Sequence, residues 1–407
     1  MGRDNKGGRL DDSKMLGVLV ALAALVWLTL ALGRGRFWRA DQVLPTTFPN
    51  LPQWPGVAVL IPARNEAETL PQTLPSLCRQ DYAGHLEIWL IDDQSDDGTA
   101  TIAREIAQAS RYPVQVIAGS PLPPSWSGKL WALEQGWQAI QQGRDQFQYV
   151  LLTDADIRHA PDSIARLVSK AETDGLGLVS WMVRLRCESG WDRLLIPAFL
   201  FFFQKLYPFP WVNDPQRSTA AAAGGCILIR REILHKLGGF ASVRDALIDD
   251  CTLAQRVKAL GVPLWLGLTD QTESVRRYGS LTRIWQMVAR TAFTQLGYSP
   301  WWLLGTVLGM GLVYLGPPVG CLGGAVTGKW GVALLGLLTW TLMATLYGPT
   351  LRRYDLPWTW GFTLPLAAGL YTLMTLDSAR RHWQGQGGAW KGRVYPRGNS
   401  GLVEFGD

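Results

Sequence analysis

The sequence predicts an α/β protein in which a doubly wound, mainly parallel sheet follows one transmembrane helix and precedes about three more. Three observations lead to this fold class. Short apolar segments recur at intervals of about 30 residues in the middle of the chain, and stretches with the spacing of amphipathic helices separate them. Long apolar runs stand before and after that middle region.

Four apolar runs approach the length of about 20 residues that a helix needs to cross a bilayer. They cover residues 15–32, 301–326, 330–347 and 358–376. Arginine-rich residues follow the first run where a signal peptide would have a small-residue cleavage site, so we expect a retained anchor at 15–33 after a disordered segment 1–14. The remaining runs predict a transmembrane block at 300–378, followed by a basic tail at 379–407.

The net charge of +6 is explained by the membrane rather than by nucleic acid. Basic residues gather beside the apolar runs, as expected where anionic headgroups lie on the cytoplasmic side. These residues are Arg34, Arg36, Arg39, Arg352, Arg353, Arg380 and Arg381. The five cysteines form no CxxC pair and no cluster with histidine, so neither a zinc site nor a disulfide framework is indicated.

The central segment, residues 50–295, alternates predicted strands and helices. The predicted strands are Val57–Ile61, Leu86–Ile91, Val114–Ile117 and Tyr149–Thr153, and the predicted helices are Glu66–Gln80, Thr99–Ala109 and Leu130–Gln142. An aromatic segment at 191–212 contains three prolines, and its apolar stretch is too short to span a bilayer. We expect it to lie on the bilayer surface, with a buried core helix as the alternative.

The residues singled out after three of the predicted strands are mostly polar, and they stand at the sheet edge where ligands bind in folds of this kind. They are Pro62, Arg64, Asn65 and Glu66 after the first strand, Asp92 and Asp93 after the second, and Asp154 and Asp156 after the fourth. Two carboxylates two positions apart repel each other unless a cation lies between them. The last pair therefore indicates a Mg²⁺ or Mn²⁺ site that phosphate oxygens and water complete.

A turn or a helix cap is the alternative explanation for Asp154 and Asp156, because Asp is favoured in both places. The acidic and basic residues after the remaining strands favour the metal site. Ser127–Lys129 stands just before a predicted helix, where backbone amides and a cation would attract phosphate. The full phosphate-loop pattern is absent there, so this assignment is weak on its own.

Two further motifs stand in the second half of the central segment. Gly224 and Gly225 enter a predicted strand as a pair that allows close approach of the backbone. Asp249 and Asp250 begin a predicted helix. These carboxylates could simply complement the helix dipole. Alternatively, one of them could act as a general base on the hydroxyl group of an acceptor.

Six motifs occur in the order typical of one known family of enzymes. They are residues 61–66, 91–99, 127–136, 153–157, 224–232 and 248–261. Together they resemble the inverting family 2 glycosyltransferases of the GT-A fold. Residues 287–300 and 390–395, with the membrane segments, resemble the hopanoid-biosynthesis-associated branch of that family. That branch is close to the ceramide glucosyltransferase-like enzymes.

The resemblance implies a role for each motif. The nucleotide of the donor would be bound by Pro62, Arg64, Asn65, Glu66, Asp92, Asp93, Lys129 and Asp154, and the metal by Asp154 and Asp156. Asp250 is implied as the catalytic base, and Asp249 stands where relatives usually carry Glu. Gly224, Gly225, Gln286 and Arg290 would lie on the acceptor or diphosphate side.

The resemblance also implies the reaction and the partners. The expected enzyme is an inverting, metal-dependent hexosyl- or N-acetylhexosaminyltransferase that uses a nucleotide sugar, with UDP the favoured carrier, and a lipid acceptor such as a hopanoid. Residues 285–291 lack the Arg-Trp pair that many relatives carry, which weakens the alternative of a processive polysaccharide synthase. A nucleotidyl- or phosphotransferase could use the same acidic strand ends, and an inactive membrane scaffold could retain the fold for binding alone.

Nucleotide sugars are cytosolic, so we expect a multi-pass protein of the bacterial cytoplasmic membrane whose catalytic domain faces the cytoplasm. Three full C-terminal spans would place the basic tail on the opposite side, against the positive-inside tendency. A re-entrant segment near Pro317–Pro318 or between Pro357 and Pro365 would remove this conflict.

Overall fold

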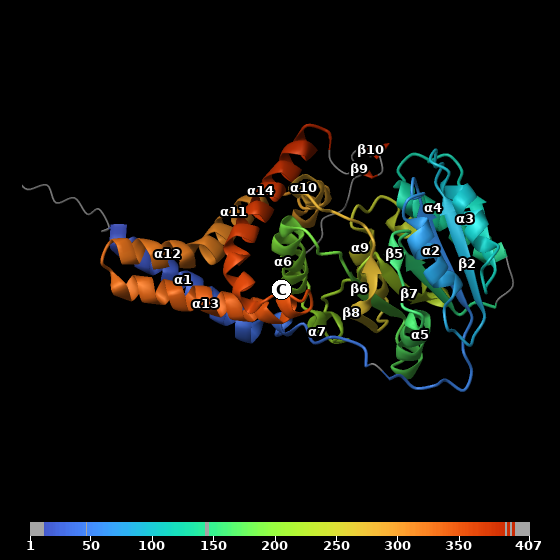
Figure 1. The fold of residues 1–407 in the computed structure, drawn as a ribbon, viewed down its shortest axis with the longest axis horizontal. Coiled ribbons are helices and arrows are strands. Elements are labelled where there is room, and N and C mark those ends of the chain that lie inside the picture. Colours follow the sequence, from blue (N-terminus) through green and yellow to red (C-terminus); the bar gives the residue numbers. More distant parts are fainter. Residues whose placement is uncertain (1–11, 46, 143–145, 387–388, 391–392, 395–407) are drawn as a thin grey trace, which may run out of the picture.

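The computed structural model describes residues 12–45, 47–142, 146–386, 389–390 and 393–394. An α/β domain and a bundle of long helices lie side by side (Figure 1). The predicted disordered segment 1–14 falls mostly outside the described residues, as does most of the predicted basic tail. Residues 379–383 of that tail continue a helix, α14 (Leu364–Trp383).

The described part of the domain contains one mixed sheet of eight strands, in the order β3-β2-β1-β4-β7-β6-β8-β5. The strands are β1 (Val57–Ala63), β2 (Leu86–Asp92), β3 (Val114–Ala118), β4 (Tyr149–Thr153), β5 (Ile157–Arg158), β6 (Leu178–Arg184), β7 (Cys226–Arg230) and β8 (Leu264–Ser274). Strands β1 to β4 are parallel, as are β6 and β8, whereas β7 is antiparallel to both of its neighbours and β5 is antiparallel to β8. The predicted doubly wound, mainly parallel sheet is confirmed.

The sheet separates two hydrophobic cores because successive side chains of a strand point to opposite faces. In β1, Ala58 and Leu60 belong to one core, and Val57, Val59 and Ile61 to the second. The first core also receives side chains from α4 (Gly128–Gln142) and α9 (Asp249–Ala259). The second receives them from α2 (Leu70–Cys78), α3 (Thr99–Ala107) and α5 (Ser163–Thr173). Both faces are therefore covered, and β1 is a continuous apolar run.

The helix predicted at Glu66–Gln80 begins later, at Leu70. Pro71 stands in the first turn of α2, where its missing N–H group would have no partner within the helix. The residues before it, from Arg64 onward, form turns at the edge of the sheet instead. The shorter helix leaves Glu66 outside the helical backbone, at the carboxyl end of β1.

Three helices among the described residues are long and apolar enough to cross a membrane, by length and composition: Lys14–Gly33, Pro300–Val326 and Trp330–Arg352. They correspond to α1 (Asp12–Gly33), to α11 (Pro300–Met310), η4 (Gly311–Leu315) and α12 (Gly316–Val326) in succession, and to α13 (Trp330–Arg352). Figure 1 shows α1, α12 and α13 running together away from the sheet, and the three helices are in contact. The π-helical turn η4 leaves the carbonyl of Val313 to accept a hydrogen bond from Trp27 Nε1 at 2.8 Å.

The third predicted C-terminal span, at 358–376, differs from the prediction. Its first residues form the 3₁₀ turn η5 (Trp358–Thr363), and α14 then ends in a charged turn with Asp377, Arg380 and Arg381. This helix does not qualify as a span, and it packs against α6 (Gly190–Leu206), α10 (Leu281–Ala289) and α11. The helical hairpin from Pro300 to Arg352 thus begins and ends at the end of the bundle that is nearer to the α/β domain, and α14 lies at that end as well (Figure 1).

The segment 191–212 forms α6 and the short helix α7 (Phe209–Val212). Most apolar side chains of α6 pack inside the protein, against α13, α14 and the domain, and Phe201 is completely buried. Sequence analysis predicts a segment resting on lipid, but these side chains have protein neighbours. The reason is that α14, which sequence analysis places across the membrane, instead folds back and covers α6.

Ion pairs connect the membrane helices to the sheet. Arg353, at the end of α13, contacts both carboxylate oxygens of Asp270 in β8 at 2.8 Å. Arg184 of β6 contacts Asp355 at 2.7 Å. The chain before the domain adds a backbone hydrogen bond from Leu268 N to the carbonyl of Gln42. The domain is therefore held to the bundle on the side of β6 and β8.

We predict that Gly336→Ala destabilises the protein, because α12 and α13 approach closely at this residue. A Cβ atom there would lie 2.4 Å from the backbone nitrogen of Cys321 and 2.7 Å from the carbonyl oxygen of Pro317. Overpacking of this kind costs about 1–3 kcal/mol. The measurement is the apparent midpoint of thermal unfolding in detergent. Gly331→Ala in the same helix is the control, since its Cβ would meet nothing within 4 Å; equal midpoints for the two variants would contradict the prediction.

Candidate active site

The carboxyl ends of β1 and β4 open into a cleft with a volume of about 1420 Å³. Its walls also include residues of β6, α6 and α10, so the cleft reaches from the sheet edge to the helices that contact the bundle. The predicted site residues that line it are Pro62, Asn65, Glu66, Lys129, Asp154, Asp156, Gly224, Gly225, Asp249, Asp250, Gln286 and Arg290. The structure thus brings together motifs that are up to about 230 residues apart in the chain.

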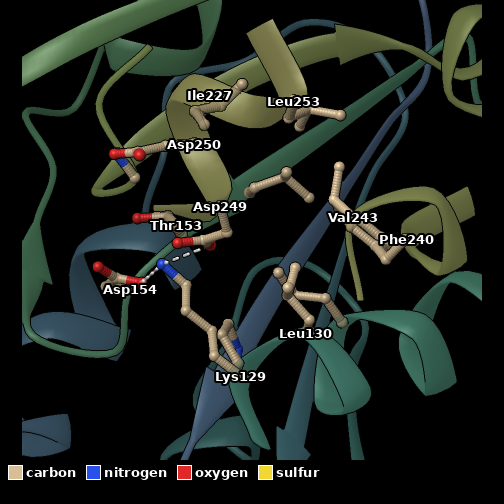
Figure 2. A pocket seen from close by; sticks show the side chains of 14 residues that line it. Lys129, Leu130, Thr153, Asp154, Ile227, Phe240, Val243, Asp249, Asp250 and Leu253 are labelled. Atoms are coloured by element: carbon tan, nitrogen blue, oxygen red, sulfur yellow. Dashed lines mark hydrogen bonds and ion pairs between the residues drawn. The ribbon is translucent and has the colours of Figure 1, made fainter. Parts of the chain in front are cut away.

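Lys129 occupies the centre of the sheet edge. It stands in the first turn of α4, and its Nζ lies 2.9 Å from Asp154 Oδ1 and 3.4 Å from Asp249 Oδ2 (Figure 2). Burial alone would lower the pKa of Lys129, but the two carboxylates outweigh burial and raise it. The ammonium group therefore stays charged and is available to stabilise negative charge in the cleft.

Asp249 and Asp250 have different environments although they are neighbours. Asp249 points toward Lys129, whereas Asp250 accepts hydrogen bonds from the backbone nitrogens of Gly224 at 2.8 Å and Cys251 at 2.7 Å. Burial, followed by repulsion from Asp249, raises the pKa of Asp250 to about 6, and Lys129 opposes this rise. Asp250 is thus held by uncharged donors, and its raised pKa suits a proton acceptor near neutral pH.

Gly224 permits this packing of Asp250 and Lys129. A Cβ atom at position 224 would lie 3.2 Å from Lys129 Nζ and 3.3 Å from Asp250 Oδ2. At Gly225 a Cβ atom would meet Val183 Cγ2 at 2.9 Å. A side chain at either position would therefore crowd its neighbours, as predicted. At Gly224 these neighbours are the site residues Lys129 and Asp250, and at Gly225 the nearest neighbour is Val183 of β6.

Asp156 has partners that sequence analysis does not identify. Its Oδ2 accepts hydrogen bonds from Arg276 Nε at 3.0 Å and from Ser274 Oγ at 2.8 Å. The same guanidinium donates through Nη2 to Glu66 Oε1 at 3.1 Å. Asp154 and Asp156 therefore do not share one counter-ion in this structure: Lys129 neutralises the first and Arg276 the second. Ser274 ends β8, and Arg276 follows it by two residues. Residues just past a strand are candidates for the site, but the strand at β8 is not among those predicted from the sequence.

Arg64, Asp92 and Asp93 join two loops at the sheet edge and are not part of the described cleft lining. Arg64 Nη1 donates to the carbonyl oxygens of Asp93 at 2.5 Å and Gln94 at 3.2 Å. Asp92 Oδ1 accepts from Ser95 N at 3.2 Å, and the Asp93 side chain is buried. These contacts give the three residues a role in shaping the loops, while binding of a nucleoside by them stays a prediction.

Gln286 and Arg290 lie on the α10 side of the cleft, across from the strand ends. This helix is fixed from behind, because Trp285 Nε1 donates to Asp377 Oδ2 of α14 at 2.8 Å. The wall beside them is apolar and consists of Met182, Leu185, Phe199, Phe203 and Met287. Charged residues at the strand ends and these apolar side chains thus line the same cleft.

The residues present fit a hard divalent cation. Asp154 and Asp156 offer carboxylate oxygens, and the Asp154 side chain is 35% exposed in the cleft. No group of three or more His, Cys, Asp or Glu side chains in the described ranges could hold a metal ion alone. This agrees with the way Mg²⁺ is bound by one or two carboxylates together with substrate phosphates and water.

The mixed sheet with acidic residues at the end of its fourth strand defines the GT-A class of glycosyltransferase folds. A mannosyltransferase from Pyrobaculum calidifontis, solved with GDP-Man and Mn²⁺, has this fold with a TM-score of 0.53 and 19% identity, over 89% of this chain and 99% of that one. The chain belongs to glycosyl transferase family 21, whose sequence model matches residues 16–395.

Two curated relatives are similar to about half of this chain. A probable glycosyltransferase YdaM of Bacillus subtilis is 27% identical over 58% of this chain and 56% of its own length. An undecaprenyl-phosphate 4-deoxy-4-formamido-L-arabinose transferase of Pseudomonas savastanoi is 30% identical over 44% of this chain and 49% of its own length. The chain thus spans about half the length of the curated relatives it matches. The predicted GT-A glycosyltransferase class and its likeness to ceramide glucosyltransferase-like enzymes are supported, but the family model that matches is family 21, where the prediction named family 2. The narrower hopanoid branch stays a prediction.

We predict that Gly224→Ala lowers glycosyl transfer by up to about tenfold, because catalysis depends on the placement of the reacting groups and the new Cβ atom would force a shift of a few tenths of an ångström. The new Cβ atom would displace Lys129 or Asp250. Activity of the purified variant is measured beside that of Gly190→Ala, whose Cβ atom would meet nothing within 4 Å. Wild-type activity in Gly224→Ala would show that the close approach is not needed.

Proposed function

We propose that the protein transfers a sugar from a nucleotide sugar, with UDP as the favoured carrier, to a hydroxyl group of a lipid at the membrane surface, with inversion at the anomeric carbon. One observation carries this proposal. Asp250, with its raised pKa, and Lys129, which contacts Asp154, stand in a single cleft that extends to α6 and α10 beside the bundle. One cleft thus offers a base, a cation that can bind phosphate and an apolar wall to the nucleotide sugar and the lipid acceptor.

The roles follow from the contacts of each side chain. Asp250 would accept the proton of the acceptor hydroxyl while the oxygen attacks the anomeric carbon from the side opposite the leaving nucleotide. Lys129 would stabilise the charge that develops on the leaving diphosphate. Asp154 and Asp156 would hold Mg²⁺ or Mn²⁺, which when bound supplies further positive charge to that diphosphate. A single displacement of this kind inverts the configuration.

A lipid acceptor is supported by the apolar half of the cleft. Its residues come from β6, α6 and α10, and α6 and α10 both contact α14. The name of the Pseudomonas savastanoi relative refers to undecaprenyl-phosphate, a lipid-linked phosphate. A hopanoid or another polycyclic or sphingoid lipid is the acceptor that we favour by sequence resemblance. The three candidate spans among the described residues support a single transfer over a processive synthase, which would need more helices for a channel.

The fold supports a catalytic domain on the cytoplasmic side of a bacterial inner membrane. Arg34, Arg36 and Arg39 follow α1 on the side of the sheet, Arg352 and Arg353 end α13 on that side, and Arg380 and Arg381 are in α14. This distribution follows the positive-inside tendency. Three full C-terminal spans would place basic residues on the side opposite to the cytoplasm. With two spans, Arg380 and Arg381 stay on the same side as the catalytic domain.

The first test compares wild-type protein with Asp250→Asn in detergent, with Mn²⁺, a panel of labelled nucleotide sugars and a total lipid extract. We expect label to enter the organic phase with the wild type, and the variant to lose at least about a hundredfold in rate. The matched control is Asp245→Asn, an exposed acid outside the cleft lining. Equal transfer by wild type and Asp250→Asn would remove Asp250 from the mechanism, and binding without transfer to any lipid would favour a scaffold.

The second test is the pH dependence of kcat/KM. A base must be deprotonated, and the pKa of Asp250 is raised to about 6, so activity should rise as the pH increases through about 6. Asp249→Asn removes a repulsive charge beside Asp250, lowers the pKa of Asp250 and should shift this acid limb to lower pH. An acid limb at the same pH in both proteins would contradict the assignment of Asp250 as the titrating base.

A further inference from the structure

We propose that Arg276 is a resident counter-ion of the donor site: it holds Asp156 and Glu66 together before the donor binds, and it releases Asp156 when the divalent cation enters. This inference rests on the proposed function, because it requires the metal site at Asp154 and Asp156. It assigns to Arg276 a positioning role that precedes donor binding.

The guanidinium bridges two carboxylates that follow different strands. Nε lies 3.0 Å from Asp156 Oδ2, and Nη2 lies 3.1 Å from Glu66 Oε1. Ser274 Oγ donates to the same oxygen of Asp156, and the backbone nitrogen of Val275 donates to the Asp156 carbonyl oxygen at 2.9 Å. The end of β8 is therefore fastened directly to the predicted metal-binding loop.

Arg276 compensates two buried negative charges. Asp156 and Glu66 are only 8% and 7% exposed, and buried carboxylates are costly unless a cation and hydrogen bonds compensate them. A divalent cation would compensate Asp156 during the reaction, but another positive group is needed at other times. Arg276 supplies this charge from within the chain.

Arg276 can release its partner Asp156 more readily than Lys129 can release Asp154. The Arg276 side chain is 38% exposed and lines the cleft, whereas Lys129 is 19% exposed and contacts Asp154 and Asp249. An arginine also has separate donors in a rigid fork, so Nη2 can keep Glu66 after Nε has released Asp156.

The experiment measures Mn²⁺ binding to the full-length protein in detergent without nucleotide, by electron paramagnetic resonance of free Mn²⁺. Arg276→Gln removes the competing cation, so we expect it to bind Mn²⁺ about tenfold more tightly than the wild type. Without metal, the same variant should unfold at a lower temperature, since two buried carboxylates lose the positive charge of Arg276, and Mn²⁺ should raise its midpoint by more than it raises that of the wild type. Unchanged or weaker Mn²⁺ binding by Arg276→Gln would overturn the inference.

Two further variants keep the test decisive. Arg158→Gln is the matched control, because Arg158 lies two residues from Asp156 but pairs with Glu273 at the surface, and its Mn²⁺ affinity should stay close to that of the wild type. If Arg276→Gln fails to fold, Arg276→Met, which is also uncharged, takes its place, with an affinity above that of the wild type expected and the wild-type value as the contradicting result. Absence of Mn²⁺ binding by every variant, even with UDP added, would contradict the proposed donor site itself. Binding that is indifferent to residue 276 would contradict the role of Arg276 alone.

Discussion

The structure depends on the compensation of negative charge at the end of a buried strand. β4 is completely buried up to Thr153, and it delivers two carboxylates to the floor of the cleft. Each carboxylate has a basic partner from elsewhere in the chain, Lys129 for Asp154 and Arg276 for Asp156. Because unpaired charges at such a position would be costly, the placement of α4 and β8 is tied to the placement of the acids.

The same arrangement links the site to the membrane helices. β8 carries Ser274 at one end of the site and Asp270 nearby, and Asp270 is paired with Arg353 of α13. On the opposite wall, α10 is held by Asp377 of α14 through Trp285. The strand that leads to the counter-ion and the helix that lines the cleft are thus both in contact with the helical bundle.

Local patterns in the sequence were sufficient for the first half of the sheet and for most of the site. β1, β2 and β4 are short apolar runs that end in polar residues, and the residues after β1 and β4 line the cleft, whereas Asp92 and Asp93 at the end of β2 do not. The later strands were harder to predict because β8 has polar residues through its second half, and it is stabilised by pairing with β6 rather than by an apolar pattern of its own. Arg276 was missed for that reason. The number of spans was overestimated because the apolar run at 358–376 is divided between η5 and α14, and the apolar part of α14 is followed by the charged turn with Asp377, Arg380 and Arg381.

The ion pairs between the end of α13 and the sheet also bear on where an acceptor must reach. Arg353 with Asp270, and Arg184 with Asp355, join the domain to the chain at the end of α13. Under the proposed function, the hydroxyl group of a lipid acceptor would have to extend from the bilayer to Asp250. The reach of a lipid's polar end would then be a requirement for reaction in addition to the contacts that its chemical groups make in the cleft.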